Sequence, residues 1–416
     1  MGITYKNKIP YLEEQNLVEI TNLIETPFYV YSQKNIIDTF LKLKKKLNKD
    51  IYFSIKANSN QAIIALLNSL GAGTDVVSQE EMQRAILAGV SPEMIIFEGV
   101  GKSNSSIENA IHYNIRQINV ESIEELQLVD SIAHTLNKKP RIGLRVNPDI
   151  DAKILYKIST GQKTDKFGID FNQLQETCEI LKSLKNINFS GLSCHIGSQI
   201  FEIKIFEQIF TKMKQAVKIF QSNNLSISHL DLGGGFGIPY DNKQSHLDIN
   251  KLSTLIDSIY PNPPFKISFE PGRYLIAQAG YLITKILTKK QNGGINFLIT
   301  DAGMQTFLRP AMYHASHKIL PFNYIGKEIT YTIAGPICES SDIIIKDIKL
   351  PSQTKDNFLI ICDVGAYGSV MSSNYNSKCL PTEILVNKNE YAIIRNPENI
   401  EKIIKRDKSP NWKKIS

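Results

Sequence analysis

The chain has 416 residues, of which 42% are hydrophobic and 21% charged, with a formal net charge of +7. This length suits two domains, and the apolar fraction supports a sizeable core without a metal or disulfide staple. The mildly basic balance suits a small anionic ligand but is too diffuse to indicate a nucleic-acid partner. No run approaches the roughly 18 apolar residues of a membrane-spanning helix, so we expect no membrane partner.

The first eight residues are polar and lack the apolar core of a signal peptide, which predicts a cytoplasmic location. Five cysteines are scattered without a C-x-x-C pair, which argues against a disulfide framework and a cysteine zinc site. His314 and His317 have helical spacing, but no acidic third ligand accompanies them. The sequence therefore predicts no metal site.

Short β-branched or aromatic runs recur along the first two thirds of the chain and predict strands. They cover residues 51–55, 74–77, 94–97, 117–120, 141–146, 189–194, 229–232 and 266–269. Amphipathic segments between them predict helices, among them residues 61–70, 79–88, 122–136 and 204–220. Strand-helix alternation indicates a parallel sheet, and about eight such units are typical of a (β/α)8 barrel. A doubly wound open sheet is the alternative, but residues 57–60 lack its G-x-G-x-x-G fingerprint.

The alternation of strands and helices ends at about residue 280. Beyond it, predicted strands separated by turns indicate a mostly antiparallel β domain. These strands cover residues 281–287, 297–300, 330–334, 343–349, 358–364 and 390–395. Residues 27–31 precede the first barrel strand and are expected to join this domain. We therefore predict a barrel domain at 32–278 and a β-rich domain formed by 1–31 together with 279–416.

Unusual residues fall at the ends of the predicted barrel strands, where barrel enzymes hold their active sites. Lys56 ends the first strand, His195 ends the sixth, a glycine run at 233–237 follows the seventh, and Glu270 follows the eighth. Each has an ordinary structural interpretation: an ion-paired lysine, a core histidine, a tight turn, and a partner for Arg273. Together they describe a Schiff-base lysine, a flat ring that stacks, a phosphate cradle and a counter-charge for a pyridine nitrogen. That combination predicts pyridoxal phosphate.

The β-rich domain adds three clusters, each of which has an ordinary loop as its alternative. Arg309 lies in the segment 307–313 and is suited to a bidentate grip on a carboxylate. Cys338 lies in the segment 335–342, beside a carboxylate, and is a candidate proton donor. The third cluster covers residues 363–369.

These motifs closely resemble the fold-type III pyridoxal-phosphate decarboxylases and, within them, the diaminopimelate decarboxylase family. The segments that carry the resemblance are 26–31, 52–58, 195–199, 233–237, 270–273, 309–313, 335–342 and 365–367. They occur in the family's order between about residue 25 and residue 400. The resemblance implies an alanine racemase-like architecture. One departure is the loop at Gln305, where the family usually has a different run.

The resemblance also implies residue roles. Lys56, His195 and Cys338 would be catalytic, with Lys56 holding the cofactor as a Schiff base and His195 stacking on its ring. The implied cofactor residues are Lys56, Asp75, His195, Ser198, Gly234, Gly235, Glu270, Gly272, Arg273 and Tyr367. The implied substrate residues are Arg273, Arg309, Tyr313, Glu339 and Tyr367. Cys338 and Glu339 would come from the other subunit of a homodimer with shared active sites.

The implied reaction converts meso-2,6-diaminopimelate to L-lysine and CO2, the last step of lysine biosynthesis. An ornithine or arginine decarboxylase of the same fold is the nearest alternative, and Arg309 and Glu339 argue instead for a substrate with two charges at its far end. An amino-acid racemase is disfavoured by Glu270. A Schiff-base aldolase without pyridoxal would explain neither Glu270 nor the second domain. A non-catalytic homologue that regulates a partner is the alternative outside enzymes, although Lys56 and Cys338 are both present.

Overall fold

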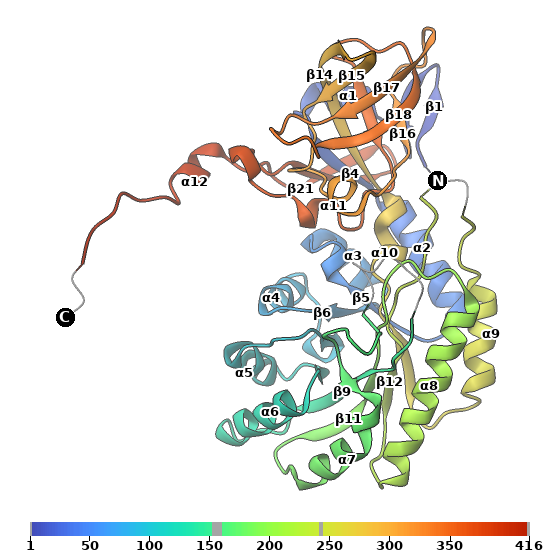
Figure 1. Cartoon of the computed structure of the whole chain (residues 1–416), viewed down its shortest axis with the longest axis vertical. Coiled ribbons are helices and arrows are strands. Elements are labelled where there is room, and N and C mark those ends of the chain that lie inside the picture. The colour runs from blue at the N-terminus through green and yellow to red at the C-terminus, as the bar shows by residue number, and fades with distance from the viewer. Residues whose placement is uncertain (1, 152–159, 241–243, 414–416) are drawn as a thin grey trace. The chain divides into compact units, whose positions relative to one another are not determined.

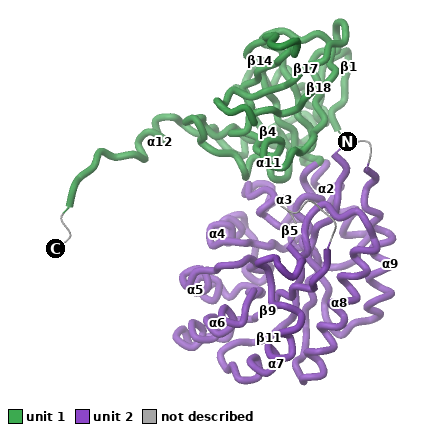
Figure 2. The backbone as a smooth tube through the Cα atoms, in the orientation of Figure 1, with its two compact units in different colours: residues 1–34, 278–416 green, residues 35–277 purple. Residues whose placement is uncertain are grey.

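The computed structural model describes residues 2–151, 160–240 and 244–413. The chain divides into two compact units, shown in Figure 2. Unit 1 comprises Met1–Lys34 and Gln278–Ser416, and unit 2 comprises Asn35–Ala277. Unit 2 is thus inserted into the sequence of unit 1. Within the described ranges, no helix combines the length and apolar character needed to cross a membrane.

Unit 2 is a closed barrel of eight parallel strands with helices around it (Figure 1). The strands are β5 (Asp50–Ser54), β6 (Gly73–Val76), β7 (Ile95–Phe97), β8 (Gln117–Val120), β9 (Arg141–Asn147), β11 (Asn188–Ser193), β12 (His229–Asp231) and β13 (Lys266–Phe269). Neighbours in this series pair in order, and β13 pairs with β5 to close the barrel. The two-residue strand β10 (Ile169–Asp170) pairs with β9. All eight predicted runs are strands, which confirms the (β/α)8 barrel.

The helices of unit 2 alternate with its strands. They are α2 (Gln33–Leu47), α3 (Gln61–Ser69), α4 (Gln79–Leu87), α5 (Asn104–Tyr113), α6 (Ile123–Thr135), α7 (Leu174–Ser183), α8 (Ile203–Ser222), α9 (Ile249–Ile259) and α10 (Arg273–Ile276). The start of α4 follows from an S-x-x-E capping pattern. Ser78 Oγ accepts a hydrogen bond from the Glu81 amide, and Glu81 Oε2 accepts one from the Val77 amide at 2.8 Å. Local sequence therefore fixes the point at which the chain leaves the barrel rim and enters the helix.

Unit 1 is built on a mixed, mostly antiparallel sheet. Its strands are β4 (Phe28–Ser32), β14 (Gly280–Asn292), β15 (Ile295–Thr300), β16 (Ile319–Pro321), β17 (Glu328–Ala334), β18 (Ile343–Pro351), β19 (Phe358–Ile361), β20 (Thr382–Asn387) and β21 (Glu390–Arg395). The order is β18-β17-β15-β14-β4-β20-β21, and β19 pairs with both β14 and β16. The β15–β17 and β4–β20 pairs are parallel. This confirms the second β domain, although strand β20 was not among the predicted runs.

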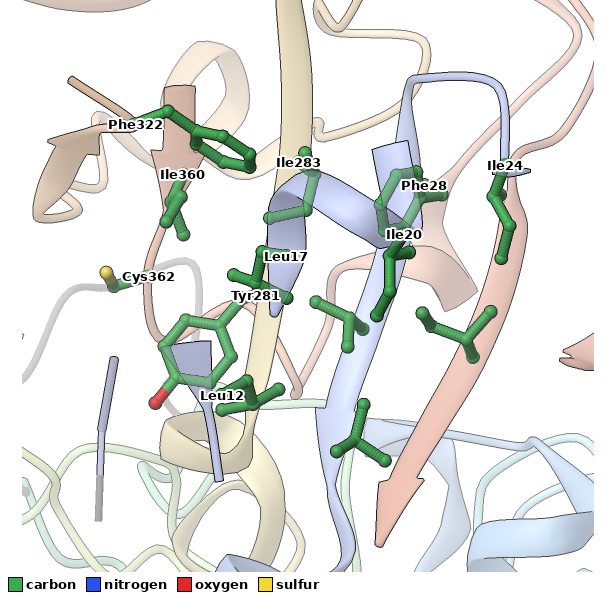
Figure 3. Packing of buried hydrophobic residues seen from close by; sticks show 13 residues of the cluster. Leu12, Leu17, Ile20, Ile24, Phe28, Tyr281, Ile283, Phe322, Ile360 and Cys362 are labelled. Carbon is green, nitrogen blue, oxygen red and sulfur yellow. The ribbon is translucent and has the colours of Figure 1, made fainter. Parts of the chain in front are cut away.

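Smaller elements complete unit 1. They are β1 (Thr4–Lys6), β2 (Ile9–Leu12), β3 (Gln15–Asn16), α1 (Leu17–Leu23), α11 (Arg309–Tyr313) and α12 (Ile400–Ile404). Helix α1 packs its buried face, with Leu17 and Ile20, against Phe28 of β4 and Ile283 of β14 (Figure 3). All five residues of β4 are buried; the strand lies between β14 and β20, and its Phe28 and Val30 share a core cluster with α1. The N-terminal segment is thus part of the core of unit 1.

Candidate active site

The predicted barrel residues gather at one rim of unit 2. In a parallel barrel all strands end at the same face, so side chains that follow different strands are brought together there. Lys56 lies in a 3-10 turn (Ile55–Ala57) directly after β5, and Asp75 lies in β6. His195 follows β11 and Glu270 follows β13.

Lys56 is ion-paired across the barrel rim. Its Nζ lies 3.2 Å from Oδ2 of Asp75, whose side chain is fully buried. Ser54 Oγ lies 2.6 Å from the same Asp75 oxygen and 2.9 Å from the Glu270 carbonyl oxygen. The structure thus shows the ion-paired lysine that the sequence left as an alternative. It also leaves the amine half-exposed, within reach of a ligand.

Glu270 is a buried carboxyl group with an unsatisfied oxygen. Its side chain is buried, and within the part of the chain that the structure describes its Oε1 has no hydrogen-bond partner. Burial, followed by the neighbouring carboxylates of Asp231, Asp75 and Glu98, raises the pKa of Glu270 well above its usual value. Buried polar groups are normally hydrogen-bonded, so an orphaned oxygen at a barrel rim indicates a missing donor or cation.

His195 is a neutral ring beside the glycine run. Its Nδ1 accepts a hydrogen bond from the Gly234 amide at 3.3 Å, which assigns the ring hydrogen to Nε2. Burial, followed by the positive charges of Lys56 and Arg145, lowers the pKa of His195 well below its usual value. An uncharged flat ring is suited to stacking on another aromatic ring.

The glycine run allows three loops to close on one another. A Cβ at Gly234 would lie 2.2 Å from the Glu270 carbonyl oxygen, and one at Gly235 would lie 2.4 Å from the Gly197 carbonyl oxygen. Gly235 also has a φ of +81°, which L side chains rarely adopt. The Glu270 amide donates to the Gly233 carbonyl at 2.7 Å, which ties the turn after β12 to the end of β13.

Arg273 brings a buried positive charge to the same rim. It begins α10 and is 6% exposed. Its Nε donates to Ser198 Oγ at 3.1 Å, and one of its terminal nitrogens donates to the Tyr240 hydroxyl at 2.8 Å. Gly272, directly before it, allows close packing because a Cβ there would lie 2.9 Å from the Ala57 Cβ. A guanidinium, a hydroxyl and glycine amides together are suited to an anion such as phosphate.

The remaining predicted residues belong to unit 1. Arg309 is the first residue of α11 and is 6% exposed, and its guanidinium carbon lies 5.9 Å from the centre of the Tyr313 ring. Tyr367 is half-buried, with a φ of +56°. Cys338 and Glu339 are exposed, and Glu339 Oε1 accepts a hydrogen bond from the Tyr375 hydroxyl.

Asp342 holds the loop that carries Cys338 and Glu339. Its two carboxylate oxygens accept hydrogen bonds from the Met304 amide at 2.6 Å and the Ile337 amide at 2.8 Å. The Gly335 amide donates to the Asp342 carbonyl at 3.0 Å, which closes the loop at its base. The sequence alone does not indicate this role of Asp342, since only the fold shows that its carboxylate turns back on its own loop.

Two other residues gained their roles only from the structure. Tyr240 was not singled out, because nothing in the sequence places it beside Arg273. His317 was considered only as a metal ligand; it is buried, whereas His314 is exposed. Gln305, where the loop departs from the family, is buried, and its Nε2 donates to the Asp301 carbonyl at 3.2 Å.

Comparison with known proteins identifies the family. A family model described as the pyridoxal binding domain of pyridoxal-dependent decarboxylases matches residues 33–277. Diaminopimelate decarboxylase of Aquifex aeolicus is 36% identical over 404 residues, which is 97% of this chain and 96% of that protein. The enzyme of Helicobacter pylori strain J99 is 38% identical over 391 residues, 93% of this chain and 96% of that protein. This chain belongs to the diaminopimelate decarboxylase family.

Solved structures of the family have the same fold. Diaminopimelate decarboxylase from Helicobacter pylori, complexed with L-lysine, has a TM-score of 0.91 at 36% identity and covers 94% of this chain and 99% of that one. The M. jannaschii enzyme, in co-complex with L-lysine, has a TM-score of 0.91 at 33% identity and covers 98% of each chain. The resemblance that the motifs indicated is therefore confirmed over nearly the whole length of the chain.

The rim residues fit the cofactor of this family. A pyridine ring nitrogen that carries a proton is suited to donate to Glu270 Oε1, which has no hydrogen-bond partner among the described residues. The Arg273 guanidinium and Ser198 hydroxyl, with the amides of the glycine run, are suited to its phosphate. The half-exposed Lys56 amine is suited to its aldehyde.

Proposed function

We infer that this chain catalyses the pyridoxal-phosphate-dependent decarboxylation of meso-2,6-diaminopimelate to L-lysine and CO2. The observation that carries this inference is the near-full-length similarity to diaminopimelate decarboxylases, two of which are solved with L-lysine bound. The bound cofactor would draw away the electron pair that loss of CO2 leaves on the substrate carbon.

We propose that the rim residues of unit 2 hold and tune that cofactor. Lys56 would bind it covalently, with Asp75 keeping the amine in place. Glu270 would hold a proton at the ring nitrogen, and His195 would lie against the ring face. The phosphate would be bound by the group that combines backbone and side-chain donors: Ser198, Gly234, Gly235, Gly272 and Arg273.

We propose that unit 1 recognises the substrate. Arg309 would bind the distal carboxylate and Glu339 the distal amine, with Tyr313 and Tyr367 completing the site. Two opposite charges at the far end would select a zwitterionic group over a simple amine. Cys338 or Lys56 would return a proton to the carbon that lost CO2.

We further propose a homodimer in which each active site receives Cys338 and Glu339 from the other subunit. The support is that both residues are exposed on a loop braced by Asp342. A cytoplasmic location stays a prediction.

Product analysis by mass spectrometry tests the reaction. The purified protein is incubated with pyridoxal phosphate and, separately, with meso-diaminopimelate, L-ornithine and L-arginine. We expect lysine from diaminopimelate alone and loss of product in Lys56→Ala. Lys182→Ala is the control, since Lys182 forms a surface ion pair with Glu179 and a surface hydrogen bond with Asn223, neither of which involves a rim residue. Product from ornithine or arginine would overturn the substrate assignment.

A further inference from the structure

His317 contacts the side chain of Arg309, whose guanidinium is proposed to bind the substrate. It is 2% exposed and precedes strand β16. Its ring centre lies 4.8 Å from that of Phe307 in an edge-on arrangement, which fixes the plane of the imidazole. Its two nitrogens then face two different groups, the Cys362 carbonyl and the Arg309 side chain.

These two contacts assign the tautomer of His317. Nδ1 lies 2.9 Å from the Cys362 carbonyl oxygen, and a carbonyl only accepts, so Nδ1 carries the hydrogen. Arg309 Nε donates to His317 Nε2 at 3.4 Å, and a guanidinium only donates, so Nε2 carries a lone pair. The neutral Nδ1–H form alone satisfies both contacts. In an imidazolium, Nε2 would also be a donor and would face the Arg309 donor. The two positive charges would then lie next to each other.

The contact also fixes one degree of freedom of the Arg309 guanidinium. Nε is the inner nitrogen of the planar fork, so a bond at Nε sets the direction of the two outer nitrogens. Bidentate recognition of a carboxylate depends on that direction, because both N–H···O bonds form only when the two planes match.

We propose that His317 is a positioning residue for substrate recognition, which orients Arg309 toward the distal carboxylate of the substrate. The proposal rests on the proposed function, since it deepens the role given there to Arg309. His317 would thus contribute to the affinity for a ligand whose far end carries a carboxylate. It would have no role in the chemical step.

Three substitutions separate the two hydrogen bonds of His317. His317→Asn places an amide N–H near the position of Nδ1 and removes the acceptor for Arg309. His317→Gln places an amide oxygen near the position of Nε2 and keeps that acceptor. His317→Phe keeps an aromatic ring beside Phe307 and removes both bonds. The Asn and Phe side chains differ in shape, but neither offers an acceptor to Arg309. An effect that both variants show is therefore attributed to the lost hydrogen bond from Arg309.

The readouts are KM and kcat for meso-diaminopimelate and the inhibition constants of L-lysine and cadaverine. L-Lysine keeps the carboxylate that the reaction does not remove, whereas cadaverine has no carboxylate. We expect His317→Asn and His317→Phe to raise KM and the lysine inhibition constant about tenfold, with kcat and the cadaverine constant changed by less than about threefold. His317→Gln should stay near wild type in all four values.

A double-mutant cycle with Arg309→Ala decides whether His317 acts through Arg309. If it does, His317→Asn should add nothing further to KM once Arg309 is gone. Additive losses, or equal effects on lysine and cadaverine, would overturn the proposal. Failure of the wild-type protein to make lysine would overturn the proposed function instead, so the two failures are distinct.

Discussion

Glu270 belongs to a group of acids buried in unit 2. Burial raises the pKa of Asp231 to about 7, against the lowering effect of its bonds to Ser268 and the Gly233 amide. The pKa of Glu98 is raised as well. Burial is the main cause, and the positive charge of Arg145 acts against it. Each of these acids makes it harder for Glu270 to ionise. A positively charged ring nitrogen at the rim would offset that repulsion and favour the ionised form of Glu270, as the proposed cofactor site requires.

Glu270→Gln tests this electrostatic role. The amide has nearly the same shape but bears no charge, so the ring nitrogen would lose the group that keeps it protonated. We expect kcat to fall by about 100-fold or more, with KM changed only severalfold. Steady-state kinetics at saturating pyridoxal phosphate measures this. Glu81→Gln is the control, since Glu81 is a half-buried acid, with a pKa raised by burial to about 7, yet it caps α4; equal losses in both variants would contradict the specific role.

At the scale of elements, short loops are made rigid by single side chains. The segment from Gly335 to Asp342 has few residues and little regular structure, yet one carboxylate closes it. A Cβ at Gly335 would lie 2.4 Å from Asp342 Oδ2, and one at Gly303 would lie 2.6 Å from the same oxygen. The two glycines therefore make room for the carboxylate, and the loop carries Cys338 and Glu339 as a preformed unit.

Asp342→Ala should loosen this loop. Two amides would lose a charged acceptor, and hydrogen bonds to charged groups contribute about 1.5–3 kcal/mol. We expect unfolding free energy to fall by about 2–3 kcal/mol and kcat/KM to fall by more than tenfold. Denaturant unfolding and steady-state kinetics check the two effects. Asp342→Asn keeps one acceptor oxygen and should fall between wild type and Asp342→Ala; a wild-type kcat/KM in Asp342→Ala would exclude the bracing role.

The same scale shows what sequence can and cannot predict. The eight barrel strands were recognisable because short runs with β-branched or aromatic residues recur between amphipathic segments, even where a strand carries Asp75 or Asp231. Strand β20 was not predicted, because it lies outside the regular alternation of strands and helices. Its interior Glu383 accepts a hydrogen bond from Tyr31 at 2.6 Å and pairs with Arg395. The placement of Lys56 and Glu270 at one rim followed from strand order. The contacts of His317 and Asp342 did not, because they depend on loops meeting across unit 1.

At the scale of the whole molecule, the proposed dimer, with Cys338 as the group that returns the proton, predicts complementation between two inactive variants. Lys56→Ala and Cys338→Ala each remove one part of a site. In a mixed dimer, the barrel of the Cys338→Ala subunit would receive Cys338 from the Lys56→Ala subunit, and that site would be intact.

Mixing the two variants in equal amounts, with subunit exchange, should restore about a quarter of wild-type activity. Half of the dimers would be mixed, and one site in two would be intact in each. Co-refolded mixtures assayed for lysine formation give the measurement, and the separately refolded variants are the controls. Activity that stays at the level of the controls would argue for sites completed within one subunit.

Strand β4 lies between β14 and β20 in unit 1, yet the three strands are far apart along the chain. On the ribosome, β4 emerges roughly 250 residues before β14, which at about 5–20 residues per second means a delay of tens of seconds. The last barrel strand, β13, is made at the end of that interval, shortly before β14, so the barrel strands are complete before unit 1 has its sheet. The order of synthesis thus leaves β4 without either of its sheet neighbours until the barrel strands between them have been made, and β20 becomes available later than β14.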